Sequence, residues 1–174
     1  LDAEQGAVLE TGKVYVIPAG RSDVVPGLAA VGLDVLDKRA FTKEAFRALV
    51  KKRRDQVKVF LMDKSALDSF GNAYADEILW AARLHPYRKR TQLTPEEVDR
   101  LYDAMQATLR HAIEKVRAEM GEDIHKERRN FMAVHMKTGE ACPRCGTAIS
   151  LVGANQRITN FCRTCQPGGL IKGM

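Results

Sequence analysis

Two Cys-x-x-Cys pairs near the C-terminus constrain this chain more than any other feature of its sequence. All four cysteines lie in the last 33 residues, and 16 residues separate Cys142-Pro143-Arg144-Cys145 from Cys162-Arg163-Thr164-Cys165. Each pair forms a tight turn that directs two sulfur atoms toward one point, and two such turns complete a tetrahedral zinc site. Two disulfides or four free thiols are the alternatives, but disulfides need an oxidising compartment, to which nothing in the sequence points.

Four thiolates would leave no coordination position open on the metal. We therefore expect one Zn²⁺ with a structural role, held by Cys142, Cys145, Cys162 and Cys165. The residues between the pairs favour a β-hairpin, because Ala148–Val152 and Arg157–Phe161 are β-like and Gly153–Gln156 reads as a turn. The hairpin would bring the two cysteine turns together.

The part of the chain before the cysteines predicts four helices. Thr42 can cap the first, and Thr94-Pro95-Glu96-Glu97 has the residues of a capping box with proline at the first helical position. The inward residues of a second expected helix are Val57, Phe60, Leu61 and Leu67. A third helix is expected to run over Ala73–Ala82 until His85-Pro86 stops it. Residues 14–17 read as a short strand, and residues 19–34 and 121–137 read as linkers.

The charge of the chain favours a polyanionic partner. Lys and Arg number 28 against 22 Asp and Glu, and the surplus lies after residue 40, because residues 1–40 carry −2 and the rest +8. Nucleic acid is the first candidate for such a partner, and an ordinary charged surface is the alternative. A membrane partner is not expected, since no stretch approaches the roughly 18 apolar residues of a span and the first residues lack the pattern of a signal peptide.

Several residues could hold phosphate. Gly71-Asn72 precedes a helix whose free N–H groups would favour an anion, although an ordinary Asn N-cap would look the same. Lys58, which follows Arg54, could share a face with Asn72, and Arg157 begins the second strand of the hairpin. Solvent-exposed side chains are the alternative for these cations. The four histidines show no ligand spacing and read as surface or packing residues.

Taken together, these segments resemble the C-terminal half of the formamidopyrimidine-DNA glycosylase / endonuclease VIII family of base-excision repair enzymes. The residues that carry the resemblance are Lys58–Asp63, Gly71–Glu77, His85-Pro86, Gly139–Gly146 and Gln156–Cys165. The resemblance implies a mainly α fold with a small β zinc hairpin, in which a helix–two-turn–helix bundle precedes a four-Cys zinc finger. It divides the chain into residues 1–40 (the tail of an N-terminal β-sandwich domain and a linker), residues 41–137 (the DNA-binding helices) and residues 138–174 (the zinc finger).

The resemblance also assigns roles to residues. Lys58 and Asn72 would grip the phosphates that flank the lesion, Gly71 and Arg54 would lie at the DNA, and Arg157 would clamp phosphate and assist the second (δ) elimination. The segment Val134–Lys137 differs from the aromatic-Gly-basic pattern that usually precedes this zinc finger. The implied partner is duplex DNA with a damaged base or an abasic site.

In the family, the amine of an N-terminal Pro attacks the sugar and a neighbouring Glu supplies a proton, after which the strand is cut by β/δ-elimination. This chain begins at Leu1-Asp2 instead. We therefore expect the DNA-binding C-terminal part of a bifunctional glycosylase/AP lyase, inactive by itself, acting as a monomer in the bacterial cytoplasm. A non-catalytic, zinc-dependent nucleic-acid-binding protein is the alternative, and a zinc module for protein contacts is a third, weaker one.

Overall fold

The chain is mainly helical, with two small two-stranded sheets, which confirms the expected fold class. The computed structural model describes residues 15–21, 24–25, 32–52, 54–68, 70–120, 128–153 and 158–168. Its elements are β1 (Leu33–Asp34), α1 (Lys43–Lys51), α2 (Val57–Leu61), β2 (Leu67–Asp68), α3 (Asn72–Ala81), the 3₁₀ helix η2 (Arg90–Gln92), α4 (Pro95–Glu119), β3 (Ser150–Val152) and β4 (Thr159–Phe161). Residues 1–30 and 31–174 form two separate compact units.

Helix α4 is the longest element, and it begins where its capping box predicts. The Thr94 hydroxyl accepts a hydrogen bond from the Glu97 N–H at 3.3 Å, and the Glu97 carboxylate accepts one from the Thr94 N–H at 2.9 Å. These reciprocal bonds satisfy two of the donors that a helix start leaves free. Thr42 caps α1 in a similar way, with its hydroxyl accepting from the Ala45 N–H. Both predicted helix starts are confirmed.

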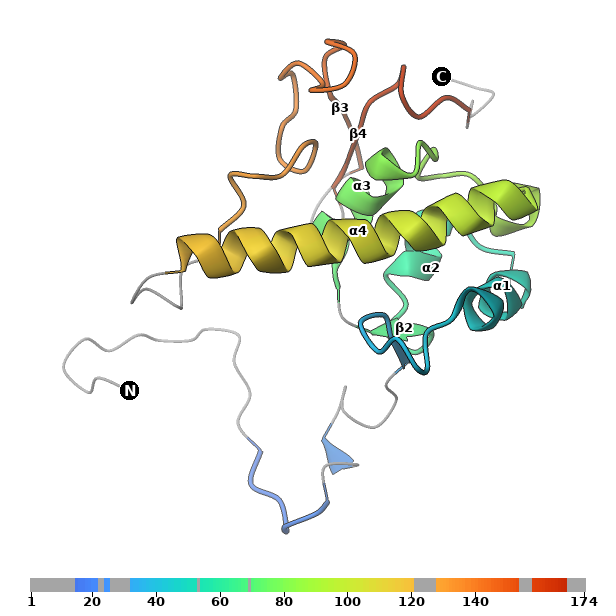
Figure 1. Cartoon of the computed structure of the whole chain (residues 1–174), viewed down its shortest axis with the longest axis vertical. Coiled ribbons are helices and arrows are strands. Elements are labelled where there is room, and N and C mark those ends of the chain that lie inside the picture. Colours follow the sequence, from blue (N-terminus) through green and yellow to red (C-terminus); the bar gives the residue numbers. More distant parts are fainter. Residues whose placement is uncertain are drawn as a thin grey trace, which may run out of the picture. The chain divides into compact units, whose positions relative to one another are not determined.

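Helices α1 and α3 pack along α4, and together with α2 they enclose the main core (Figure 1). Side chains that this core buries almost completely include Val35, Phe41, Phe46, Phe60, Leu61, Leu67, Ile78, Leu79, Leu101 and Met105. The aromatic rings of Phe41, Phe46 and Tyr102 lie within about 6 Å of one another. Burial of this apolar surface is the main term that stabilises the bundle.

The segment expected to be a linker contributes to this core. Leu33 in β1 pairs in parallel with Leu67 in β2, and Val35 is fully buried. Leu67 therefore lies on a strand and not on the second helix, which ends at Leu61. Gly32 makes the close approach possible, because a Cβ there would lie 2.3 Å from the Ala66 carbonyl carbon.

Helix α3 spans Asn72–Ala81, within one residue of the predicted Ala73–Ala82 at each end, and it ends through its own C-terminal motif. The Leu84 N–H bonds to the Leu79 carbonyl and the Arg83 N–H bonds to the Trp80 carbonyl, the pattern of a Schellman motif. Arg83 takes the left-handed position of that motif, with φ 56°, where glycine is usual. Backbone hydrogen bonding thus ends the helix before the proline is reached.

The predicted hairpin is present as antiparallel strands β3 and β4, in which Ser150 pairs with Phe161 and Val152 with Thr159. Its predicted turn lies partly outside the described residues, and Arg157 lies outside them. The segment before the hairpin is more than a linker, because Met132, Val134 and His135 are buried. A small second core, formed by Val134, Cys142, Ile149 and Cys162, packs against Trp80.

Of the first compact unit, residues 1–30, the structure describes residues 15–21 and 24–25. Residues 15–17 do not form the predicted strand, and Val14 lies outside the described residues. A strand is defined by its pairing with another, and these residues have no such partner in the described part of the unit. No helix among the described residues combines the length and apolar character that crossing a membrane requires.

Candidate nucleic-acid interface and metal centre

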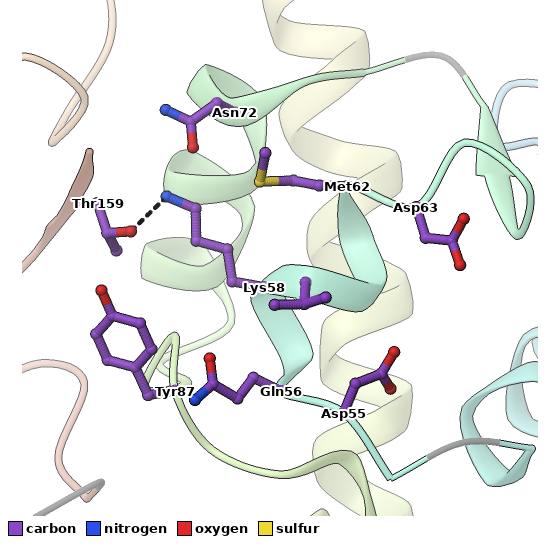
Figure 2. A pocket seen from close by; sticks show the side chains of 9 residues that line it. Asp55, Gln56, Lys58, Met62, Asp63, Asn72, Tyr87 and Thr159 are labelled. Carbon is purple, nitrogen blue, oxygen red and sulfur yellow. Dashed lines mark hydrogen bonds between the residues drawn. The ribbon is translucent and has the colours of Figure 1, made fainter. Parts of the chain in front are cut away.

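A pocket of about 360 Å³ lies where the helical bundle meets the zinc hairpin (Figure 2). Helix α2 and the loop before it, the start of α3 and strand β4 all contribute side chains. Its lining residues are Asp55, Gln56, Lys58, Val59, Met62, Asp63, Asn72, Tyr87 and Thr159. The structure thus brings together Lys58 and Asn72, the pair that the sequence placed on one face.

Lys58 projects from α2 toward strand β4 of the hairpin, where it bonds to Thr159 (Figure 2). Its ammonium group donates three hydrogen bonds in all. The acceptors are Asp76 Oδ1 at 2.6 Å, the Ile158 carbonyl at 3.1 Å and Thr159 Oγ1 at 2.8 Å. These use every donor that an ammonium offers. Burial lowers the pKa of Lys58 from its ordinary value, while the charge and hydrogen bond of Asp76 oppose that shift.

Asn72 is the first residue of α3 and does not act as its N-cap. The cap position belongs to Gly71, and no side chain caps the helix. The Asn72 side chain instead donates from Nδ2 to the Ile158 carbonyl at 2.9 Å, so Lys58 and Asn72 share one acceptor on the hairpin. Free backbone N–H groups in the first helical turn, together with the helix dipole, favour an anion at this position.

Gly71 leaves open space at the mouth of this helix. A Cβ built on Gly71 meets nothing within 4 Å, and the backbone there is extended, with φ −123°. The fold itself therefore does not require glycine at this position. Arg54, the other predicted DNA contact described by the structure, is exposed two residues before the N-cap of α2.

Two acidic residues of α3 hold strand β4 and the segment 133–135 against the helices, and sequence reasoning gave them no role. Asp76 Oδ2 accepts from His135 Nδ1 at 2.9 Å and from the Asn160 N–H at 3.2 Å, while Oδ1 pairs with Lys58. Glu77 accepts from the backbone N–H groups of residues 133, 134 and 135, each at 2.8 Å. The signal that could have found them is an acidic pair within an otherwise apolar helical segment. Carboxylates that such a segment buries need hydrogen-bond partners, so the pair predicts contacts with another part of the chain.

The histidine expectation is confirmed in part. His135 is buried and bonded to Asp76, and His85 packs edge-on against Phe161, with 4.9 Å between ring centroids. The backbone N–H of Tyr87 donates to His85 Nδ1, which suits a neutral ring. Burial lowers the pKa of His85 from its ordinary value.

The four cysteines form one cluster, as their spacing predicts. Their sulfur atoms all lie within 4.8 Å of one another, with 3.4 Å between Cys145 and Cys162 and 3.9 Å between Cys142 and Cys165. Tetrahedral zinc with 2.3 Å bonds to sulfur separates its ligands by about 3.8 Å. The arrangement therefore fits a zinc ion, which these four side chains would hold.

The protonation of the thiols also favours a cation. Hydrogen bonds from Thr147 lower the pKa of Cys145 to about 6, whereas burial and the neighbouring thiols raise that of Cys165 to about 12. Four thiolates this close repel one another unless a positive ion lies between them. The cluster can thus ionise fully only with a bound metal.

Comparison with known proteins agrees with this geometry. Residues 31–123 match the family model described as the formamidopyrimidine-DNA glycosylase H2TH domain, and residues 139–168 match the zinc finger found in FPG and IleRS. The formamidopyrimidine-DNA glycosylase of Deinococcus radiodurans is 36% identical over 165 residues, which are 90% of this chain and 58% of that protein. The enzyme of Pelotomaculum thermopropionicum is 32% identical, over 89% of this chain and 58% of its own length.

Solved structures show the same relationship. The MutM (FPG) protein of Thermus thermophilus superimposes with a TM-score of 0.74 and 32% identity, covering 87% of this chain and 59% of its own. A Lactococcus lactis Fpg complex with DNA containing an abasic site gives a TM-score of 0.67 and 28% identity, over 80% and 52% of the two chains. This chain spans about half the length of the relatives that it matches. The matched helical domain, the zinc finger and the shared structure show that the chain belongs to the formamidopyrimidine-DNA glycosylase family.

Proposed function

We propose that this chain binds duplex DNA at a damaged base or an abasic site, as the DNA-binding region of a base-excision repair glycosylase. The observation that carries the proposal is the convergence of Lys58 and Asn72 on the Ile158 carbonyl, beside the uncapped start of α3. Helices and hairpin form one surface there, and a net charge of +6 favours a polyanion. The Lactococcus lactis relative in complex with abasic DNA supports the choice of partner.

Phosphate would lie at the start of α3, where Gly71 leaves room for it. The backbone N–H groups of the first turn and the second N–H of the Asn72 amide would donate to its oxygens. Arg54, which is exposed just before α2, would add a further phosphate contact. By resemblance, Arg157 would add another. Such contacts position DNA without reading its sequence, so binding would depend strongly on salt.

Lys58 would act mainly by position and charge. Its ammonium fixes the Ile158 carbonyl and Thr159 relative to α2, and a direct phosphate contact would have to replace one of its three present acceptors. The acidic residues lining the pocket are partly neutralised, since Asp55 pairs with buried Arg90.

Base excision and AP lyase activity are proposed for the whole family protein, and this chain by itself is proposed to be inactive. Excision requires a deprotonated amine directed at the sugar. Lys58 is the amine that lines the described pocket, and its hydrogen bonds to Asp76 and the hairpin keep its lone pair unavailable. Borohydride trapping on abasic duplex DNA tests this point, and a covalent adduct in good yield would contradict it.

Binding is tested by fluorescence anisotropy with a duplex that carries a tetrahydrofuran abasic-site analogue, titrated at several salt concentrations. We expect affinity to fall linearly on a log–log plot against salt. Arg54→Gln should weaken binding, whereas the matched control Lys43→Gln removes an exposed cation of α1 that pairs with Asp103 away from the pocket lining. Equal effects of the two variants, or affinity that does not change with salt, would refute the proposed surface. Light scattering of the free chain tests the accompanying proposal that it is a monomer.

A further inference from the structure

Trp80 joins the helical bundle to the zinc cluster through a specific contact. It is the sole tryptophan of the chain and lies in the last turn of α3. Its indole Nε1–H donates to Cys142 Sγ at 3.4 Å. Sulfur is a weak acceptor when neutral but a strong one when charged, so this bond gains strength when Cys142 is a thiolate.

The first cysteine turn also contacts Trp80 through Arg144. The Arg144 guanidinium lies over the indole ring, 4.1 Å from its centroid, and Arg144 Nη1 donates to the Trp80 carbonyl at 3.0 Å. The turn Cys142–Cys145 therefore contacts Trp80 with both a sulfur ligand and a stacked cation. The stacked guanidinium and the bond to sulfur are the two contacts that orient the indole N–H.

The second cysteine turn is bound to the same end of α3. Gln166 is fully buried, and it donates from Nε2 to the Leu84 carbonyl while its Oε1 accepts from the Cys162 N–H. Both halves of the cluster thus rest on the residues around the end of α3. The opposite end of α3 carries Asn72, which lines the pocket.

We propose that Trp80 is a positioning residue of the metal centre, whose N–H stabilises Cys142 as a zinc ligand and so ties metal loading to the placement of α3. The proposal rests on zinc binding by the four-cysteine cluster described above. Partners in hydrogen-bonding contact with metal ligands orient those ligands and tune their basicity, and removing one costs about 10–100-fold in metal affinity. A donor aimed at a thiolate offsets part of its charge, which favours four thiolates around one ion.

The test exploits the presence of a single tryptophan. Expression in a tryptophan auxotroph supplied with benzothienylalanine replaces Trp80 alone, and it keeps the bicyclic ring while removing the N–H. Trp80→Phe gives the same loss with a standard amino acid. Tyr102→Phe is the matched control, because it removes an aromatic donor that bonds to the Phe41 carbonyl in the main core.

Two measurements are made on the full chain with Co²⁺ and with Zn²⁺. Hydrogen bonding to a thiolate lowers the energy of its lone pairs, so its loss should move the sulfur-to-Co²⁺ charge-transfer band to longer wavelength. Competition with a chromophoric chelator should show zinc affinity weakened about 10-fold or more in both Trp80 replacements. The Tyr102 variant should match the unmodified chain in both measurements.

The outcomes separate the inference from the metal site on which it rests. An unmodified chain that gives no tetrahedral Co²⁺–thiolate spectrum would refute the metal centre itself. A normal spectrum in the unmodified chain, with band and affinity unchanged by benzothienylalanine, would refute the role of Trp80 alone. Weakened affinity without a band shift would also overturn the inference, because it would show a packing effect and not a hydrogen bond to the ligand.

Discussion

Lys58 Nζ lies 2.6 Å from Asp76 Oδ1, and neither side chain is more than 6% exposed. The pair joins α2 to α3, and each partner also bonds to the hairpin, through Thr159 and Asn160 respectively. A buried ion pair is not in itself a source of stability, because desolvation offsets much of the attraction. Its value here lies in fixing two helices and one strand in a single arrangement around the pocket.

Removing one member of that pair should be costly. Asp76→Asn leaves a buried ammonium without its counter-charge and weakens the bonds to His135 and Asn160, so we expect unfolding free energy to fall by about 3–5 kcal/mol. Urea denaturation measures the change. The control Asp103→Asn breaks an exposed pair with Lys43 and should change stability little. Equal effects of the two variants would contradict the structural role of Asp76.

Gly71 offers a way to separate folding from binding. Since a Cβ at this position meets nothing in the chain, Gly71→Ala should leave the melting temperature nearly unchanged. The same Cβ would intrude where phosphate is proposed to approach, so DNA affinity should fall about tenfold, a loss of about 1.4 kcal/mol. Gly32→Ala provides the contrast, because its Cβ would clash with the Ala66 backbone and should destabilise the bundle. Unchanged DNA affinity in Gly71→Ala would argue against phosphate at the start of α3.

Met136 occupies the glycine position of the aromatic-Gly-basic pattern, and its φ is 59°. A left-handed backbone is strained for methionine, and its side chain is 65% exposed, so little packing is lost on truncation. We expect Met136→Gly to stabilise the chain by about 0.5–1 kcal/mol, after the greater freedom of glycine in the unfolded state is subtracted. The bond from the Met136 N–H to Asn160 Oδ1 remains available. Thermal unfolding monitored by circular dichroism checks the result, and a lower melting temperature would contradict it.

His85 should make stability depend on pH. Burial lowers its folded pKa below the ordinary 6.5, so the unfolded chain binds more protons as pH falls. The contribution of His85 to the free energy of unfolding is therefore complete above pH 6.5. It is lost as the pH drops from 6.5 through the folded pKa. His85→Gln should reduce the slope of unfolding free energy against pH in this range, whereas His111→Gln, on the exposed side of α4, serves as the control. Identical slopes in the unmodified chain and in both variants would contradict a lowered pKa of His85.

Metal removal should affect the two cores differently. The cluster around Cys142 and Cys162 is separate from the core enclosed by α1 to α4. We expect a strong chelator to disorder residues 138–166 while the helices persist, because the small core depends on its metal for stability. Hydrogen exchange measured segment by segment, together with helical circular dichroism, distinguishes the parts. Protection of the hairpin that does not change without metal would contradict this expectation.

The sequence by itself determined the features whose parts lie close together in the chain. The capping box of α4 spans Thr94 to Glu97, and each cysteine turn spans four residues, so local geometry sets both. The amphipathic helices follow from the spacing of apolar residues in the same way. Resemblance to a family added the roles of Lys58 and Asn72 and supplied the order of the two modules.

Only the tertiary structure decided which distant residues meet. Asp76 contacts Lys58, 18 residues away, and His135, 59 residues away, while Trp80 reaches Cys142 across 62 residues. Likewise, Leu33 and Val35 looked like linker residues until the strand partner of Leu33 and the burial of Val35 were known. No local pattern encodes such contacts, because their energy depends on burial and on a partner brought near by packing of the whole chain.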